Sequence, residues 1–271
     1  MRQGELFRAE KPPVVVAYGV GVDSTAMLVG MAKRGERPDA ITFADTGTEW
    51  PETYAYLPIM QAWLSSVGFP AVTTVRYVVR HRRYSSLAEN CTVLHTLPGL
   101  SFGKKSCSPK WKRGPQDKWV KAWEPFKAAG GKCVRLIGYD SGPKDAKRGW
   151  NMADDATFTY RYPLREWGWD RERCQREISD AGLPVPRKSA CWCCLSMQPW
   201  ELDDLIRLHP DLADRIIEIE RLAAPYLRNC EGLWRKATRK RPGSMTEWIL
   251  RRRNGQRVDV PADAACDQCE A

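Results

Sequence analysis

Short apolar runs separated by glycines and polar turns mark the first half of this 271-residue chain. Val14-Val15-Val16 is the clearest run, because consecutive β-branched residues favour a strand buried on both faces of a parallel sheet. Between the runs, apolar residues recur at the spacing of one helix face. The alternation predicts an α/β fold with a mostly parallel sheet. The predicted strands cover residues 14–16, 39–44, 71–79 and 134–138, and the first predicted helices cover residues 25–33 and 53–67.

The character of the chain changes near Gly182. Asp170 is a predicted N-cap for a helix over residues 171–181, and the glycine after it is a typical helix end. Amphipathic helices are predicted beyond it, over residues 200–208 and 212–227. We therefore expect an α/β domain over 1–182 and a cysteine-rich helical region with a basic surface and a loose tail over 183–271.

A glycine-containing loop follows the first strand. It reads Tyr18-Gly19-Val20-Gly21-Val22, and Asp23-Ser24-Thr25 then predicts the N-cap of the first helix. A strand, a glycine loop and a helix N-terminus together form an anion site, because backbone N–H groups face the ligand. The loop lacks the Gly-Lys-Ser/Thr of a P-loop and the third glycine of the GxGxxG fingerprint. An ordinary strand-to-helix turn is the alternative interpretation.

The order of residues in this loop resembles the SGGxDS pyrophosphate loop of the N-type ATP pyrophosphatases, close to their PAPS reductase-like branch. Gly19-Val20 stand where that family has Ser-Gly, so its first hydroxyl is missing here. Four further blocks are similar to the family's and follow in the same order, so the resemblance covers roughly residues 13–210. They are DTGTEWPET at 45–53, the basic stretch around Cys107, the strand end at Gly138 with its continuation to Arg148, and the YPL–EWGW…GLP–P–KS–C–C stretch up to Cys194.

The resemblance implies a doubly wound, Rossmann-like fold of the adenine nucleotide alpha hydrolase type, with ATP and Mg²⁺ at the glycine loop. It implies that Asp23 helps to place the metal or water. Lys110 and Arg148 would offset the charge that builds as pyrophosphate leaves, and these three are the candidate catalytic residues. The implied nucleotide-binding residues are Tyr18, Gly19, Val20, Gly21, Val22, Asp23, Ser24, Thr25, Phe43, Asp45, Thr46, Gly47, Gly138 and Lys144.

Ten cysteines in a chain without a signal-peptide pattern indicate metal ligands or redox groups rather than structural disulfides. Cys191 and Cys194 have the CxxC spacing at which two thiolates of one turn can hold one metal. The resemblance places Cys107 in the same pocket, and these three favour a [4Fe–4S] cluster, which sulfur-handling relatives carry on a similar arrangement. Cys269 is the candidate fourth ligand, and Cys266, Cys91 and Cys230 are its alternatives. Zinc, held by two CxxC pairs, is one alternative. Thiol chemistry at a C-terminal cysteine, Cys266 or Cys269, is another.

The charge of the chain suits a polyanionic partner. Lysine and arginine outnumber acidic residues by ten, and the sequence pI is near 9.2. DNA or RNA is the obvious partner, although solubility and a basic nucleotide pocket explain the charge equally well. Arg235–Arg241 and Arg251–Arg253 are basic runs near Trp234 and Trp248, a combination that suits stacking on bases. No apolar run reaches the ~20 residues of a membrane span, so we expect a cytoplasmic protein without a membrane partner.

These features lead to one favoured function and two rivals. The favoured one is an enzyme that binds ATP, adenylates a substrate with release of pyrophosphate, and supports sulfur transfer, with nucleic acid as a candidate substrate. A sulfur-donor protein would be a further partner, and a homo-oligomer is compatible with the sequence. The first rival is a reductase of phosphoadenylyl sulfate that uses a C-terminal thiolate. The second is a non-catalytic module that binds nucleotide or nucleic acid.

Overall fold

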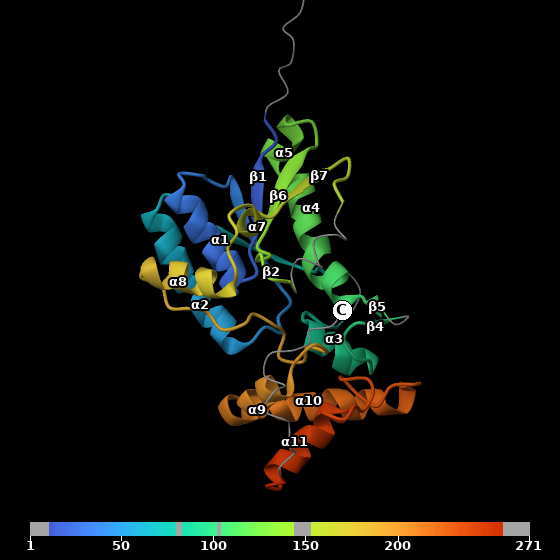
Figure 1. The fold of residues 1–271 in the computed structure, drawn as a ribbon. Helices are drawn as coiled ribbons and strands as arrows, with labels where there is room; N and C mark the ends of the chain where they lie inside the picture. The colour runs from blue at the N-terminus through green and yellow to red at the C-terminus, as the bar shows by residue number, and fades with distance from the viewer. Residues whose placement is uncertain (1–10, 80–82, 102–103, 144–152, 257–271) are drawn as a thin grey trace, which may run out of the picture. The chain divides into compact units, whose positions relative to one another are not determined.

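The structure is a computed structural model that describes residues 11–79, 83–101, 104–143 and 153–256 (Figure 1). The chain divides into two compact units, and neither is one continuous stretch. The first unit comprises Met1–Ala44, Pro51–Arg76 and Arg113–Ser189, and the second comprises Asp45–Trp50, Tyr77–Lys112 and Ala190–Ala271. The sequence-based division after residue 182 lies close to the Ser189–Ala190 boundary, and the structure adds two earlier segments to the second unit.

A five-stranded sheet in the order β3-β2-β1-β6-β7 forms the centre of the first unit. The pairs β1/β2, β1/β6 and β6/β7 are parallel, with Val15 opposite Ala40 and Val14 opposite Val134. This confirms the predicted doubly wound α/β fold. The strands are β1 (Val14–Ala17), β2 (Ala40–Asp45), β3 (Val72–Arg76), β6 (Cys133–Ile137) and β7 (Phe158–Arg161).

Helices cover both faces of this sheet (Figure 1). Val16 of β1 packs into a core with α1, α2 and α8, whereas its neighbour Val15 packs into a second core with α4 and α5. Strand residues alternate between the faces, and this explains why the strands read as continuous apolar runs. The covering helices are α1 (Val22–Lys33), α2 (Pro51–Ser66), α4 (Gly114–Ala122), α5 (Glu124–Ala128), α7 (Pro163–Glu166) and α8 (Arg171–Asp180).

The buried Glu177 ties α8 to α1. Its carboxylate pairs with Lys33 of α1 and with Arg173 on its own helix. Burial alone would disfavour the charge of Glu177, but the two cations outweigh that effect and lower its pKa. The pair therefore fixes α8 against the helix that begins at the glycine loop.

The strand order creates a topological switch point. β1 lies between β2 and β6, so the chain turns to one side of β1 with β2 and to the other with β6. In such sheets the loops at the carboxyl ends of the two central strands leave a crevice for ligands. The glycine loop after β1 and the Gly138 loop after β6 are the two loops at this position.

The second unit is mostly helical. Its long helix α10 packs against three other helices, and a core rich in tryptophan and leucine lies among them. This core also holds Cys91, Cys191 and Cys193. The elements are α3 (Leu87–Leu94), β4 (Leu100–Ser101), β5 (Lys104–Lys105), the π-helix η1 (Ser108–Arg113, whose last residue belongs to the first unit), α9 (Pro199–Leu208), α10 (Pro210–Ala223), η2 (Ala224–Tyr226) and α11 (Met245–Arg253). None of the described helices has the length and apolar character needed to cross a membrane.

Candidate functional site

The glycine loop of the first unit joins β1 to α1 in four residues, 18–21. The helix begins at Val22, earlier than predicted, and its N-cap is Gly21, without a capping side chain. The prediction that Asp23-Ser24-Thr25 caps the helix is therefore wrong. The first N–H groups of a helix have no partner within it, so those of α1 are available to an anion.

Val20 has an unusual backbone in this loop. Its φ is 59°, in the left-handed region that a β-branched residue rarely adopts, and its side chain is buried. Val20 stands where the resembled motif has glycine. Strained residues of this kind cluster at ligand sites, where the surrounding structure holds them in place.

The side chains of the loop are engaged in holding its shape. Ser24 Oγ accepts a hydrogen bond from the Gly19 N–H at 3.3 Å and donates to the Gly21 carbonyl at 3.2 Å. The Tyr18 hydroxyl lies 3.1 Å from Thr25 Oγ1, and burial raises the pKa of Tyr18. We conclude that backbone N–H groups, rather than these hydroxyls, are the groups that this loop offers to a ligand.

Gly138, at the end of β6, approaches the loop very closely. A Cβ at this position would lie 2.7 Å from both the backbone N and the Cα of Ser24, far inside normal contact. Only glycine permits this approach. The predicted site residues Gly138 and Ser24 are thus brought together at the switch point.

Ser189 contributes to the same place from a distant part of the sequence. Its Oγ is 3.8 Å from the Cβ positions that a side chain at Gly19 or Gly21 would have, and its own Cβ is 3.5 Å from that of Gly21. A hydroxyl therefore lies beside Gly19, where the resembled motif carries its own serine. Ser189 lies in the YPL–EWGW…GLP–P–KS–C–C stretch, and nothing in the sequence links it to the glycine loop.

Two other predicted site residues of the first unit, Asp23 and Phe43, make contacts within the fold, and two lie outside the described residues. Asp23 accepts a hydrogen bond from Arg171 Nη1 at 2.8 Å, so its carboxylate is already in an ion pair. Phe43 is 2% exposed and belongs to the core between the sheet and α1. Lys144 and Arg148 lie outside the described residues.

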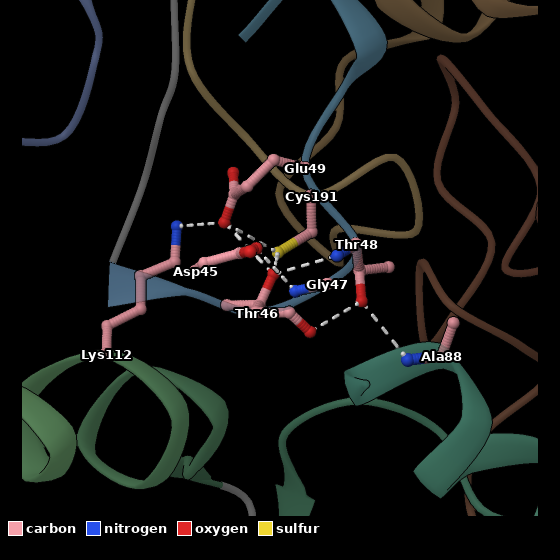
Figure 2. Close-up of polar contacts among 8 residues, drawn as sticks. All are labelled: Asp45, Thr46, Gly47, Thr48, Glu49, Ala88, Lys112 and Cys191. Carbon is pink, nitrogen blue, oxygen red and sulfur yellow. Dashed lines mark hydrogen bonds and ion pairs between the residues drawn. The ribbon is translucent and has the colours of Figure 1, made fainter. Parts of the chain in front are cut away.

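A polar cluster surrounds Cys191 in the second unit (Figure 2). The Thr46 hydroxyl donates to Glu49 Oε1 at 3.0 Å and lies 3.3 Å from Cys191 Sγ, which itself donates to Glu49 Oε1 at 3.6 Å. Lys112 Nζ is 2.9 Å from the same Glu49 oxygen. Three side chains from three separate segments therefore meet at the buried carboxylate of Glu49.

The backbone fixes this cluster. An isolated antiparallel bridge joins Glu49 to Cys191, and the N–H of Trp192 donates to the Thr48 carbonyl at 2.9 Å. Asp45 Oδ1 accepts from the Gly47 N–H at 2.7 Å, which shapes the turn between them. Asp45, Thr46 and Gly47, predicted as nucleotide ligands, are thus placed in the second unit beside a cysteine.

Burial and the charge of Glu49 act in the same direction on the pKa of Cys191 and in opposite directions on the pKa of Lys112. Burial strongly raises the pKa of Cys191, and the nearby Glu49 carboxylate adds to this rise. For Lys112 burial disfavours the ammonium, but attraction to the negative charge that Cys191 and Glu49 can carry is stronger, so its pKa is raised. The cation is therefore retained where a thiolate would need a counter-charge.

The thiols of the second unit lie in one core. Cys107 and Cys194 pack, partly buried, against the core that contains Cys191, and the pKa of Cys107 is raised by burial and by Cys194. All eight described cysteines are free. Soft thiol donors fit an iron–sulfur cluster or zinc, but no three His, Cys, Asp or Glu side chains in the described residues are arranged to hold a metal. Cys269 lies outside the described residues.

Lys110 lies in an aromatic environment of the second unit. Its ammonium is 5.1 Å from the ring centre of Tyr77 and 5.6 Å from that of Trp111, a buried residue. These are cation–π contacts. Lys110 is therefore positioned by the core of the second unit, and its proposed catalytic role remains a prediction.

Sequence reasoning missed Lys112 and Glu49 as site residues. Lys112 stands in a basic run where charge alone did not distinguish it from its neighbours, and its partner Glu49 is distant in sequence. Glu49 lies within the DTGTEWPET block, which the sequence analysis had already singled out. The contact to Cys191 depends on the fold.

The tryptophans of the basic runs are core residues rather than stacking platforms. Trp234 and Trp248 are 3% and 0% exposed and pack edge to face, with ring centres 5.7 Å apart. Their indole N–H groups donate to the Met197 carbonyl and to Asp203 Oδ1. The prediction that they stack on bases is wrong, because the core of the second unit needs both rings.

The chain resembles a solved structure but matches no family model and no curated sequence. Among solved structures, it is similar to the U34-tRNA thiolase NcsA from Methanococcus maripaludis with its [4Fe-4S] cluster, at 14% sequence identity and a TM-score of 0.39. The likeness covers 95% of this chain and 85% of that chain.

Proposed function

We propose that the protein binds ATP at the glycine loop, adenylates a nucleic-acid substrate with release of pyrophosphate, and supports replacement of the activated oxygen by sulfur. The observation that carries the proposal is the approach of Gly138 to Ser24 at 2.7 Å, measured from an added Cβ. Such contact between two loops at a switch point serves a ligand that needs backbone donors at short range.

In this proposal the chain's own groups have separate tasks. The backbone N–H groups of residues 20–24 hold the pyrophosphate, and Asp23 helps to place Mg²⁺ or water. Lys110, Lys144 and Arg148 offset the negative charge that develops when the substrate oxygen attacks the α-phosphorus and pyrophosphate departs. A sulfur nucleophile from a donor protein then displaces AMP from the activated carbon, and the oxygen leaves with AMP.

Cys107, Cys191, Cys194 and Cys269 are the residues proposed to hold a [4Fe–4S] cluster, with zinc as the alternative. Bound there, the cluster would supply a site at which sulfur is held for transfer. Lys112 would offset the charge of the thiolates, and the Thr46 hydroxyl, 3.3 Å from Cys191 Sγ, would turn its proton from Glu49 to the thiolate.

Two measurements test the proposal. Release of pyrophosphate from ATP in the presence of total tRNA is the expected activity. If sulfite appears from phosphoadenylyl sulfate instead, the reductase alternative holds and the proposal fails.

The metal assignment has its own readout. Protein purified without oxygen should contain iron and absorb broadly near ~400 nm. Cys191→Ser should lose the iron, and Cys133→Ser should keep it, because Cys133 is a buried thiol of the first unit. Equal iron in wild type and Cys191→Ser would show that the ligand assignment is wrong.

A further inference from the structure

The second unit contains two basic runs that differ in whether their side chains have acidic partners. In the first, the basic loop of residues 235–241, Lys236, Arg239 and Lys240 are exposed, and no ion pair in the described part of the chain involves them. In the second, Arg251–Arg253, every arginine has an acidic partner. The partners are Glu247 for Arg251, Asp203 for Arg252 at 2.7 Å and Asp214 for Arg253 at 2.6 Å.

A single buried carboxylate anchors the basic loop. Glu220 of α10 accepts hydrogen bonds from the N–H groups of Leu233 at 2.6 Å and Met245 at 2.9 Å, which lie on either side of the loop. It also accepts from the Thr246 N–H at 2.8 Å and the Ser244 hydroxyl at 2.5 Å. Both ends of the loop are therefore held at one point on a rigid helix.

Further contacts fix the loop from inside. The Trp234 N–H donates to the Gly243 carbonyl at 3.0 Å, and the Thr238 N–H donates to the Arg241 carbonyl at 2.8 Å. The Arg241 guanidinium lies 4.9 Å from the Trp234 ring centre and donates to the Met197 carbonyl, so it packs inward. Glu231 also contacts the loop: its carboxylate accepts from the Ala237 N–H at 3.3 Å, and its own N–H donates to the Arg235 carbonyl at 2.6 Å.

We propose that the basic loop is a docking site for the phosphate backbone of a nucleic acid, contacted by Lys236, Arg239 and Lys240. Adjacent exposed cations without protein counter-ions match a chain of phosphates, each of which can take one cation and release condensed counter-ions. A loop held at both ends loses little conformational entropy when it binds. Trp234, which precedes the loop, is buried, so the proposed contact involves the phosphate charge and no base stacking.

This inference rests on the proposed function for its class of substrate, but its test needs no ATP. The probe is fluorescently labelled total tRNA, titrated with the full-length protein over a range of salt concentrations. Lys236→Ala/Arg239→Ala/Lys240→Ala should bind about tenfold more weakly than wild type at low salt. Its plot of log affinity against log salt should be shallower by about 2 to 3, since three phosphate contacts are lost.

A matched control removes the same charge elsewhere. Arg207→Ala/Arg221→Ala/Arg251→Ala also lowers the formal net charge by three, from +10 to +7. Those arginines are exposed and paired with Asp204, Glu218 and Glu247. The control should therefore keep the wild-type slope.

The outcomes separate the two proposals. If both triple variants bind tRNA as tightly as wild type, or lose affinity equally, the basic loop is not the docking site, whatever the result for pyrophosphate release. An equal effect on a 20-base-pair DNA duplex supports contact with phosphates common to RNA and DNA. Loss of binding to phosphatidylserine vesicles, with tRNA binding unchanged, would overturn the assignment.

Discussion

The glycine loop of the first unit and the basic loop of the second are both proposed to meet phosphate, yet they are built in opposite ways. The glycine loop offers backbone N–H groups and depends on the absence of side chains, as at Gly138. The basic loop offers side-chain cations and depends on a scaffold beneath it, Glu220 and Trp234. Changes of shape should therefore damage the first loop, and changes of charge should damage the second.

The largest expected effect is on the scaffold of the basic loop. Glu220→Ala would leave three N–H groups and a hydroxyl without their acceptor in a buried place, so we expect the second unit to lose about 4 kcal/mol or more of stability. Glu218→Ala on the same helix removes a solvent-facing carboxylate and should leave the denaturation midpoint close to that of wild type. Chemical denaturation monitored by tryptophan fluorescence measures both, and equal midpoints would refute the role of Glu220.

The next effect concerns shape at the glycine loop. Gly138→Ala forces a Cβ into the backbone of Ser24, so we expect a loss of about 3 kcal/mol in stability and at least a tenfold loss in ATP affinity. Gly19→Ala meets only ordinary contacts at 3.8 Å and should fold like wild type. Thermal melting and ATP titration by calorimetry test the pair. Wild-type ATP binding by Gly138→Ala would remove the main support for the phosphate site.

The glycine loop and the Cys191 cluster differ in how much of each could be predicted from the sequence. The strands from residue 14 to 137 and the glycine loop were predictable, because their signals are local: β-branched runs, glycines and a neighbouring helix start. Edge strand β7 and helix α11 were not predicted, since β7 is short and partly polar and α11 ends in three charged residues.

The Cys191 cluster was predicted only in part. The CxxC spacing indicated Cys191, but its contacts with Thr46, Glu49 and Lys112 join three segments that only the fold brings together. Trp248 shows the opposite error. Its position beside Arg251–Arg253 suggested a binding surface, whereas its indole is buried and its N–H is bonded to Asp203.

A smaller effect is expected at the contact between α8 and α1, the helix that follows the glycine loop. The pKa of Glu177 is lower in the folded protein than in the unfolded chain. The stability that its charge contributes is therefore present above the unfolded pKa and is lost as the pH falls through the folded pKa. Glu177→Gln should cost about 2 kcal/mol at pH 7, and the gap to wild type should narrow below about pH 4.

Glu172→Gln is the control for that measurement, because Glu172 lies on the same helix, is exposed, and is 3.8 Å from its partner Arg176. It should change stability by less than about 0.5 kcal/mol at either pH. Urea denaturation at pH 7 and pH 3.5 supplies the comparison. A gap that stays constant with pH would contradict the role given to the Glu177 charge.

The smallest expected effect concerns Ser189, whose hydroxyl lies beside the glycine loop. Ser189→Ala should weaken ATP binding about fivefold, the worth of one hydrogen bond of about 1 kcal/mol. Gly19→Ser places a hydroxyl in the same space, with ordinary contacts to Ser189 and Ser24. The double variant Gly19→Ser/Ser189→Ala should therefore recover the affinity. Unchanged binding by Ser189→Ala would show that the loop needs no such group.

The bridge between Glu49 and Cys191 joins residues that the ribosome makes 142 positions apart. Strands β1, β2, β3 and β6 are all synthesised by Ile137, well before Cys191. The contacts of Thr46 and Glu49 with Cys191 can therefore form only when the last third of the chain emerges. If Cys191 holds a metal as proposed, this order of assembly means that the finished polypeptide, and not the nascent one, would receive it.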